Sequence, residues 1–347
     1  MASFPRPDGS PVPAEPLAGS FGVIALAAFE PAEPLFARQL LSIQAQTHPD
    51  FQCLISVDGN PAPVEAMVQR ICGGDSRFRV TGHEDRLGFH HNFERVLKEV
   101  PARARWVALS DQDDYWYPEK LAALLPSLDE AELVTGQARV VSAAASALGT
   151  DPSAGNITRR RKVPAADLIA NNQVTGSLCV FRRELLDLAL PFPSLGTPSQ
   201  YHDHWLGLCA LAAGGITVQE SVLQDYIQHG GNVVGESVQR LDRSVRNTLR
   251  IVGRYEPDAG PASIFRLIYK TGLGWRSLMA TTLLERLDRT GRSAPREVQD
   301  ALGIYARPQR RRLAGVLVAG LRRKNVPAMR VLEIGLGVLL RAWAPKG

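Results

Sequence analysis

The sequence predicts an α/β protein built on a mostly parallel sheet, and three observations support this fold class. Short apolar runs of strand length alternate with amphipathic stretches of helix length through about the first 125 residues. A composition of 45% hydrophobic and 22% charged residues is typical of a globular chain with a sizeable core. Carboxylates directly follow two of the apolar runs, at Asp58 and Asp111, and open α/β sheets bind ligands at this edge.

The N-terminal half is expected to alternate strands with helices. Apolar runs predict strands at 21–27, 51–57, 78–81 and 106–109. Helical periodicity and its breakers predict helices at about 34–46, 64–72, 91–99 and from residue 118 onward. Pro118 suits the first turn of the last helix, because the missing N–H and the fixed φ of proline are tolerated there.

The loop after the fourth strand holds three carboxylates within four residues, Asp111, Asp113 and Asp114. Like charges this close together destabilise a fold unless a cation or strong hydrogen-bond donors compensate. A divalent ion such as Mg²⁺ or Mn²⁺, shared with substrate phosphates, is the usual compensation, so a metal cofactor is predicted here. The alternative is an acidic loop that caps the next helix, although a single carboxylate is enough for a cap.

A length of 347 residues allows two domains. Residues 1–20 hold five prolines and no apolar segment, so they are predicted to be a disordered lead-in and no signal peptide. The four cysteines show no CxxC pairing, which predicts reduced, buried thiols and a cytoplasmic location.

The charge is distributed unevenly. Residues 240–347 hold 22 Lys and Arg against 8 Asp and Glu, a balance of +14 that leaves −9 for residues 1–239. Nucleic-acid binding by the acidic body is therefore not expected. The apolar stretches of the basic C-terminal region are shorter than the ~20 residues that span a bilayer. They predict helices that either lie on an anionic membrane surface, at the inner face of the cell membrane, or pack on the body or a second subunit.

Three motifs, taken in order, resemble those of the family 2 glycosyltransferases, which have the GT-A nucleotide-sugar-binding fold. Residues 41–51 (LSIQAQTHPDF) and 88–94 (GFHHNFE) are similar to two stretches before the acidic motif of that family. Residues 111–121 (DQDDYWYPEKL) are similar to the acidic motif of its rhamnosyltransferase-like subgroup. Further similar stretches lie at 175–185, 201–206 and 228–235. The resemblance implies a GT-A domain over residues 21–239, followed by a helical basic extension over 240–347.

The resemblance implies an inverting, metal-dependent transfer of a sugar, such as rhamnose, in bacterial surface polysaccharide synthesis. The donor would be a dTDP- or UDP-sugar, and the acceptor a saccharide or a lipid-linked saccharide. Two alternatives stay open, the same fold with a UDP-hexose donor and a catalytically inactive module that binds a sugar nucleotide. A nucleotidyltransferase would need a glycine-rich basic loop after the first strand, and residues 27–30 (AAFE) offer none.

The resemblance also implies a role for each matching residue. Asp203 is expected to be the general base, with a helix N-cap as the alternative. The expected metal ligands are Asp111, Asp113 and His229, where a structural histidine in a turn is the alternative for His229. The expected nucleotide contacts are Phe29, Glu30, Asp58, Asn92 and Asp111. The expected acceptor contacts are Asp114, Trp116, His202 and Trp205, where a core position is the alternative for the tryptophans and orientation of the loop is the alternative for Asp114.

Three positions depart from the family pattern. Val57 precedes Asp58 where the family often has a second acid, and residues 28–30 replace its usual Thr-Tyr-Asn. Ile227 stands where the family has an arginine, so a cation for the donor pyrophosphate would have to come from elsewhere. Arg182, Arg183 and the basic residues of the tail are the candidates.

Overall fold

The computed structural model describes residues 17–142, 156–228, 255 and 262–341 of the chain. Most of the predicted lead-in, the predicted metal ligand His229 and the predicted domain boundary near residue 240 lie outside these ranges. Leu17 is 1% exposed and packs in the core, so the ordered chain begins before the expected residue 21.

Among the described residues, nine strands form one mixed sheet in the order β3-β2-β1-β4-β8-β6-β9-β5, with β7 paired to β6. The strands are β1 (Gly22–Ala28), β2 (Phe51–Asp58), β3 (Phe78–His83), β4 (Trp106–Ser110), β5 (Tyr115–Trp116), β6 (Leu133–Ser142), β7 (Asn156–Ile157), β8 (Cys179–Arg182) and β9 (Ile216–Gln228). The first four strands in the order are parallel, as predicted, whereas β8 is antiparallel to both β4 and β6.

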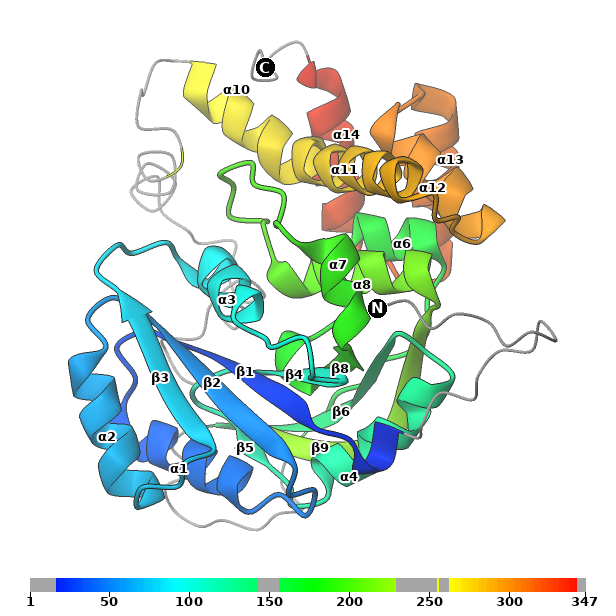
Figure 1. The fold of residues 1–347 in the computed structure, drawn as a ribbon. Helices are drawn as coiled ribbons and strands as arrows, with labels where there is room; N and C mark the ends of the chain where they lie inside the picture. Colours follow the sequence, from blue (N-terminus) through cyan, green and yellow to red (C-terminus); the bar gives the residue numbers. More distant parts are fainter. Residues whose placement is uncertain (1–16, 143–155, 229–254, 256–261, 342–347) are drawn as a thin grey trace, which may run out of the picture.

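Helices cover both faces of the sheet (Figure 1). The first four are α1 (Glu33–Gln44), α2 (Ala62–Cys72), α3 (Phe89–Lys98) and α4 (Lys120–Leu124). Because successive side chains of a strand point to opposite faces, β1 divides its residues between two cores. Ile24 and Leu26 pack with α1, α2 and α4, whereas Val23 and Ala25 pack with α3 on the other face.

The second half of the chain adds helices to the α3 face. They are α6 (Ala165–Ala170), α7 (Leu186–Ala189), α8 (His202–Ala213), α10 (Ala262–Tyr269), α11 (Trp275–Thr290), α12 (Arg296–Ala306), α13 (Arg310–Arg322) and α14 (Ala328–Leu339). Short 3₁₀ turns lie at Leu17–Gly19, Leu125–Asp129, Gly176–Leu178 and Arg183–Leu185, and a π-helical turn at Lys270–Gly274 joins α10 to α11.

The C-terminal helices share one continuous core with the sheet. Trp275, Met279 and Leu302 are fully buried in the same cluster as Val107 of β4. The Arg323 guanidinium, after α13, lies 2.7 Å from the carboxylate of Asp167, which is buried in α6. Packing of the tail on the body, one of the two alternatives from the sequence, is confirmed for these helices. Their outer faces are a separate matter and are described below.

Candidate active site

The loop after β4 begins beside the loop after β1, because the two strands are parallel neighbours. The side chain of Gln112 joins these loops. Its Oε1 accepts a hydrogen bond from the Phe29 backbone N–H at 2.8 Å, and its Nε2 donates to the Phe29 carbonyl at 3.1 Å. The acidic segment is therefore fixed at the carboxyl edge of the parallel strands, as predicted.

Asp114 lies beneath this segment and is fully buried. Its carboxylate accepts hydrogen bonds from Gln224 Nε2 at 3.0 Å and from the Ile227 backbone N–H at 3.3 Å. Burial and the neighbouring charge of Asp113 raise the pKa of Asp114 to about 7. Asp114 thus joins the acidic loop to β9, and the prediction that it contacts the acceptor is wrong because no part of it reaches the surface.

Lys120, at the start of α4, is also fully buried. Its ammonium group donates to the Ser177 carbonyl at 2.5 Å and to Gln224 Oε1 at 2.6 Å, and lies 3.6 Å from the centre of the Trp116 ring. Burial holds the pKa of Lys120 well below its usual value, although the charge of Asp114 opposes this shift. The lysine connects the acidic loop to the 3₁₀ turn before β8.

Asp111 is partly exposed. Burial, followed by the charges of Asp114, Asp113 and Asp203, raises its pKa well above the usual value, and a hydrogen bond with the Ser177 side chain opposes the shift. Asp203 is distant in sequence but near enough to act on Asp111. Ser177 adjoins Gly176, whose N–H donates to Asp203 at 3.1 Å, so one 3₁₀ turn contacts both the metal-ligand candidate Asp111 and the base candidate Asp203.

The crowded acids are suited to a divalent ion. Asp111 and Asp113 offer hard carboxylate oxygens, and a cation would relieve the repulsion by neighbouring acids that adds to burial in raising the pKa of Asp111. Within the described ranges no three His, Cys, Asp or Glu side chains form a complete ligand set by themselves. Substrate phosphates and water complete the coordination of Mg²⁺ in many enzymes, so two carboxylates fit such a site.

Asp203 is the second residue of α8 and not its N-cap, which is Tyr201. One carboxylate oxygen accepts hydrogen bonds from Asn172 Nδ2 at 2.8 Å and the His204 N–H at 2.7 Å, and the other accepts from the Gly176 N–H at 3.1 Å. Burial raises the pKa of Asp203 and the three hydrogen bonds lower it. Burial has the larger effect, so the pKa is raised to about 6. The carboxylate is thus held in place and partly exposed, with a pKa suited to accepting a proton near neutrality.

The aromatic residues expected at the acceptor lie in the interior. Trp116 and Trp205 are fully buried in the two cores, and Trp205 Nε1 donates to the Ala189 carbonyl at 2.8 Å. The prediction that they contact the acceptor is therefore wrong for both. His202 is 7% exposed and stacks on Phe93 with ring centroids 3.8 Å apart, and both of its ring nitrogens are buried without a hydrogen-bond partner. Its acceptor contact stays a prediction.

Two residues expected to bind the nucleotide instead brace the strand ends. Asn92 donates to the carbonyls of Ala28 and Ser56 and accepts from the Ser56 hydroxyl, so it has no donor left for a ligand. Asp58 is 4% exposed and accepts from the N–H groups of Leu87 and Gly88 at 2.7 and 2.8 Å. Both positions support the rim on which a nucleotide would lie, and the predicted direct contact is wrong for Asn92.

Phe29 and Glu30 lie at the rim itself, directly after β1. The Arg86 guanidinium stacks over the Phe29 ring at 3.7 Å from the ring centre. Glu30 has a positive φ of 40°, which turns the chain sharply away from the strand. Their nucleotide contacts stay predictions.

Several residues of the site gave no signal in the sequence. Lys120 stands in the motif at residues 111–121, but a lysine on a short helix is expected at the surface, and its partners Ser177 and Gln224 are 57 and 104 residues away. Asn172 and Arg160 stand in a stretch without a family motif. A charged or amide side chain next to long apolar runs would have been the only hint of their burial.

Residues 23–188 match the model of the family described as Glycosyl transferase family 2. The structure is similar to that of S. aureus TarS residues 1–349 in complex with UDP-GlcNAc, with a TM-score of 0.52 at 14% identity over 93% of this chain and 92% of that chain. The same TarS fragment in complex with UDP gives a TM-score of 0.51 at 15% identity over 93% and 91%. A search of curated proteins gives no match.

The matched segment contains the acidic loop and the rim residues after β1 and β2. At 14% and 15% identity, the likeness to TarS bears on the fold, and it extends that fold through α8 and the C-terminal helices. The site and the fold agree with the family match, and residues 23–188 of this chain form a glycosyl transferase family 2 domain.

Proposed function

We propose that this enzyme transfers a sugar from a nucleoside-diphosphate donor to a hydroxyl group of a saccharide or lipid-linked acceptor, with inversion at the anomeric carbon. One observation carries the proposal. The 3₁₀ turn at Gly176–Leu178 connects the acidic loop to the base candidate Asp203, because the Gly176 N–H donates to Asp203 at 3.1 Å and the next residue, Ser177, is hydrogen-bonded to Asp111. A donor diphosphate held at the loop would present its sugar toward Asp203.

In this mechanism the Asp203 carboxylate accepts the proton of the acceptor hydroxyl as the oxygen attacks the anomeric carbon. The bond to the nucleoside diphosphate breaks on the opposite face, so one displacement inverts the configuration. Asn172 and the N–H groups of Gly176 and His204 hold the carboxylate in position during the reaction. A pKa of about 6 leaves Asp203 ionised at neutral pH yet basic enough to accept the proton.

Asp111 and Asp113 would hold a Mg²⁺ or Mn²⁺ ion together with the donor phosphates. When bound, the ion would supply Lewis-acid stabilisation of the charge that develops on the leaving diphosphate. Asp114 and Lys120 act beneath the loop, where their hydrogen bonds to Gln224 keep the two carboxylates at the strand end. His229, the third expected ligand, lies outside the described residues.

The acidic motif at residues 111–121 limits the choice of donor. Its similarity to the rhamnosyltransferase-like subgroup favours dTDP-linked rhamnose. A UDP-hexose is the alternative, and the TarS fragment in complex with UDP-GlcNAc adds that donor to those worth testing. The setting that we propose is bacterial surface polysaccharide synthesis on the cytoplasmic side, with which four buried free cysteines are compatible.

The test of the proposed function is thermal stabilisation by a panel of dTDP-rhamnose, UDP-glucose, UDP-galactose and UDP-GlcNAc, with and without Mn²⁺. A donor at 100 times its Kd should add about 2.7 kcal/mol to the free energy of unfolding, which raises the Tm by a few degrees. The Asp113→Ala variant should fold but lose the Mn²⁺-dependent part of the shift. No stabilisation by any nucleotide sugar, or the same Mn²⁺-dependent shift in the variant, would contradict the assignment.

An inactive nucleotide-binding module would give the same thermal shifts, so turnover must be measured separately. Release of nucleoside diphosphate over a panel of saccharide acceptors distinguishes the two, because only an enzyme consumes its donor. Wild-type protein that binds a nucleotide sugar but never transfers it would favour the inactive module.

We also propose that the outer faces of α13 and α14 bind an anionic membrane surface. Four large apolar side chains of α14 are 40–67% exposed and recur at helical spacing, namely Met329, Leu332, Leu336 and Leu339. Residues 310–341 hold eight Lys and Arg against one Asp or Glu. A second copy of this chain would present the same positive charge and be repelled, whereas anionic lipid would be attracted.

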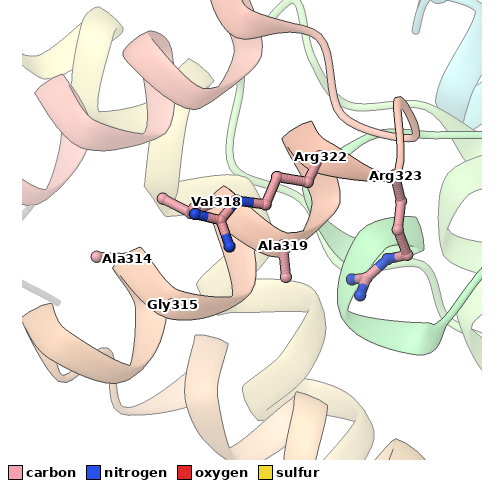
Figure 2. A pocket seen from close by; sticks show the side chains of 6 residues that line it. All are labelled: Ala314, Gly315, Val318, Ala319, Arg322 and Arg323. Carbon is pink, nitrogen blue, oxygen red and sulfur yellow. The ribbon is translucent and has the colours of Figure 1, made fainter.

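The outer surface of α13 is also hollowed, with a cavity of about 530 Å³ lined by Ala314, Gly315, Val318, Ala319, Arg322 and Arg323. Figure 2 shows the Arg322 side chain reaching over Val318, whereas Arg323 turns toward α6. Apolar surface rimmed by arginine suits the headgroup region of a bilayer. No helix of the described chain is long and apolar enough to cross a membrane, so attachment would be at the surface.

We expect the protein to bind vesicles that contain anionic lipid and to release from them as salt rises. Substituting Arg310, Arg311 and Arg312 by glutamine should weaken binding about 10²-fold, since each basic residue near the surface contributes about 1 kcal/mol. Point substitutions are preferable to truncation, because Leu313 and Leu317 of α13 belong to the core. Equal binding to neutral and anionic vesicles in a flotation assay would contradict the proposal.

A further inference from the structure

Arg160 follows β7 and is held between two neighbouring segments. Its backbone N–H donates to Gln137 Oε1 of β6 at 2.8 Å. One terminal nitrogen of its guanidinium approaches the Gln173 carbonyl at 3.5 Å, at the outer limit of a hydrogen bond. Gln173 adjoins Asn172, which holds the Asp203 carboxylate. The side chain therefore lies beside the proposed base.

The guanidinium of Arg160 lacks an ion-pair partner among the described residues. Its Nε is buried without any hydrogen-bond partner, and burial lowers the pKa of the side chain. The carboxylate with the largest electrostatic effect on it is Asp203, although the two make no ion pair. Burial of an unpaired charge costs free energy, and native proteins retain such groups mainly where a ligand supplies the partner.

Neighbouring arginines are already engaged in the fold. Arg139 pairs with Asp225 at 2.7 Å, Arg323 pairs with Asp167, and Arg161 donates to Asn325 Oδ1 at 2.7 Å. Each of them has a structural role. Arg160 differs from these three, because within the described residues no carboxylate or side-chain amide oxygen pairs with its guanidinium.

Two of the cations suggested by the sequence as replacements at Ile227, Arg182 and Arg183, do not reach the site. β8 runs antiparallel to β4, and Arg182 lies opposite Trp106, at the end of β4 away from the acidic loop. Arg183 pairs with Asp187 at 2.7 Å. Ile227 itself is fully buried. A cation for a substrate anion must come from another segment, and Arg160 is placed beside Asp203.

We propose that Arg160 binds an anionic oxygen group of a substrate, a phosphate or a carboxylate, next to Asp203. The inference rests on the proposed glycosyl transfer. The Nε edge of a guanidinium carries two parallel N–H groups that match two oxygens of such an anion. The anion has two sources, the diphosphate of the donor or a charged group on the acceptor, and the experiment below separates them.

The test compares wild-type protein with Arg160→Gln and with Arg159→Gln, where Arg159 is exposed and serves as the matched control. Calorimetry measures the binding of UDP, dTDP and uridine in the presence of Mn²⁺. A second titration adds inorganic phosphate to protein saturated with UDP and Mn²⁺. The Tm of each variant is recorded, and Arg160→Gln should match or exceed wild type because it removes an unpaired buried charge.

A donor phosphate at Arg160 predicts that Arg160→Gln weakens UDP or dTDP binding at least 10-fold and leaves uridine binding unchanged. An anionic acceptor group predicts unchanged UDP binding but loss of the phosphate titration in Arg160→Gln alone. Wild-type values for Arg160→Gln in both titrations, or a Tm well below that of wild type, would overturn the proposal. Protein that binds phosphate through Arg160 but binds no nucleotide would contradict glycosyl transfer and leave the anion site standing.

Discussion

Replacing Asp203 with asparagine is expected to lower turnover roughly 10²–10⁴-fold, the usual contribution of a positioned general base. Asparagine keeps the size of the side chain and one acceptor oxygen, but it cannot take up the proton of the acceptor hydroxyl. Donor binding should stay near the wild-type value, since Asp203 is expected to act on the acceptor. Release of nucleoside diphosphate measures the first quantity, and calorimetry measures the second.

Asp203→Asn also changes the hydrogen bonds of the side chain, so its effect on stability must be separated from its effect on turnover. An asparagine amide would meet the Gly176 N–H with another donor, so the lost hydrogen bond should cost about 1–3 kcal/mol of stability. The Asn172→Ala variant is the matched control, because it removes one hydrogen bond from the carboxylate and keeps the base. If loosening of the loop alone caused the loss of turnover, Asn172→Ala would reproduce it.

The pH dependence of the wild-type rate is a second test of whether Asp203 is the general base. The active form is the carboxylate, so kcat/KM should rise with pH and level off above an apparent pKa of about 6. In Asn172→Ala that pKa should move upward, because the lost hydrogen bond favoured the charged form. Wild-type turnover in Asp203→Asn, or an acid limb near the usual pKa of aspartate, would rule out Asp203 as the base.

Lys120→Met is expected to lower the free energy of unfolding by about 2–5 kcal/mol. The substitution leaves the Ser177 carbonyl and Gln224 Oε1 buried without a donor, and each such loss costs about 1–3 kcal/mol. Asp114 would also lose the positive charge that favours its ionised form. Chemical denaturation measures the change, and donor binding should weaken with it because the acidic loop rests on this network.

Lys98→Met provides the control for Lys120. Lys98 pairs with the buried Glu94 of α3, but its own side chain is 55% exposed. Glu94 keeps His91 and the Phe192 N–H as partners when Lys98 is removed, so this variant should lose much less stability than Lys120→Met. Equal stability of Lys120→Met and Lys98→Met would mean that the buried lysine is not required to hold the site together.

The parallel half of the sheet was predictable because three of its strands, β1, β2 and β4, are buried on both faces and therefore appear as continuous apolar runs. β9 was not predicted. Its middle section holds Gln219, Glu220 and Ser221, which are partly or fully exposed and break the apolar pattern. The apolar stretches of the C-terminal region predict helices, but nothing local to the sequence states which face of a helix meets the body.

Site residues that stand in a family motif could be predicted from the sequence. Residues whose role depends on a contact with a distant segment could not. Asp111 and Asp203 stand where the resemblance expects them, and the structure brings them to one site. Trp116 and Trp205 stand in the same motifs, yet both lie in the core. Each indole ring packs against the core and so holds in place the segment that carries the neighbouring acid. Lys120, Ser177 and Gln224 meet only after three distant segments have folded together.

The strand order also affects how the chain folds while it is being synthesised. β8 lies between β4 and β6 in the sheet, although it follows both of them in the chain. At a synthesis rate of ~5–20 residues per second, β8 emerges from the ribosome roughly 4–15 seconds after β4. During that interval β1 to β3 can already pair, while one edge of β4 has no neighbour. An unpaired apolar edge invites pairing with other chains, so β4 is a site where the nascent chain would gain from a chaperone.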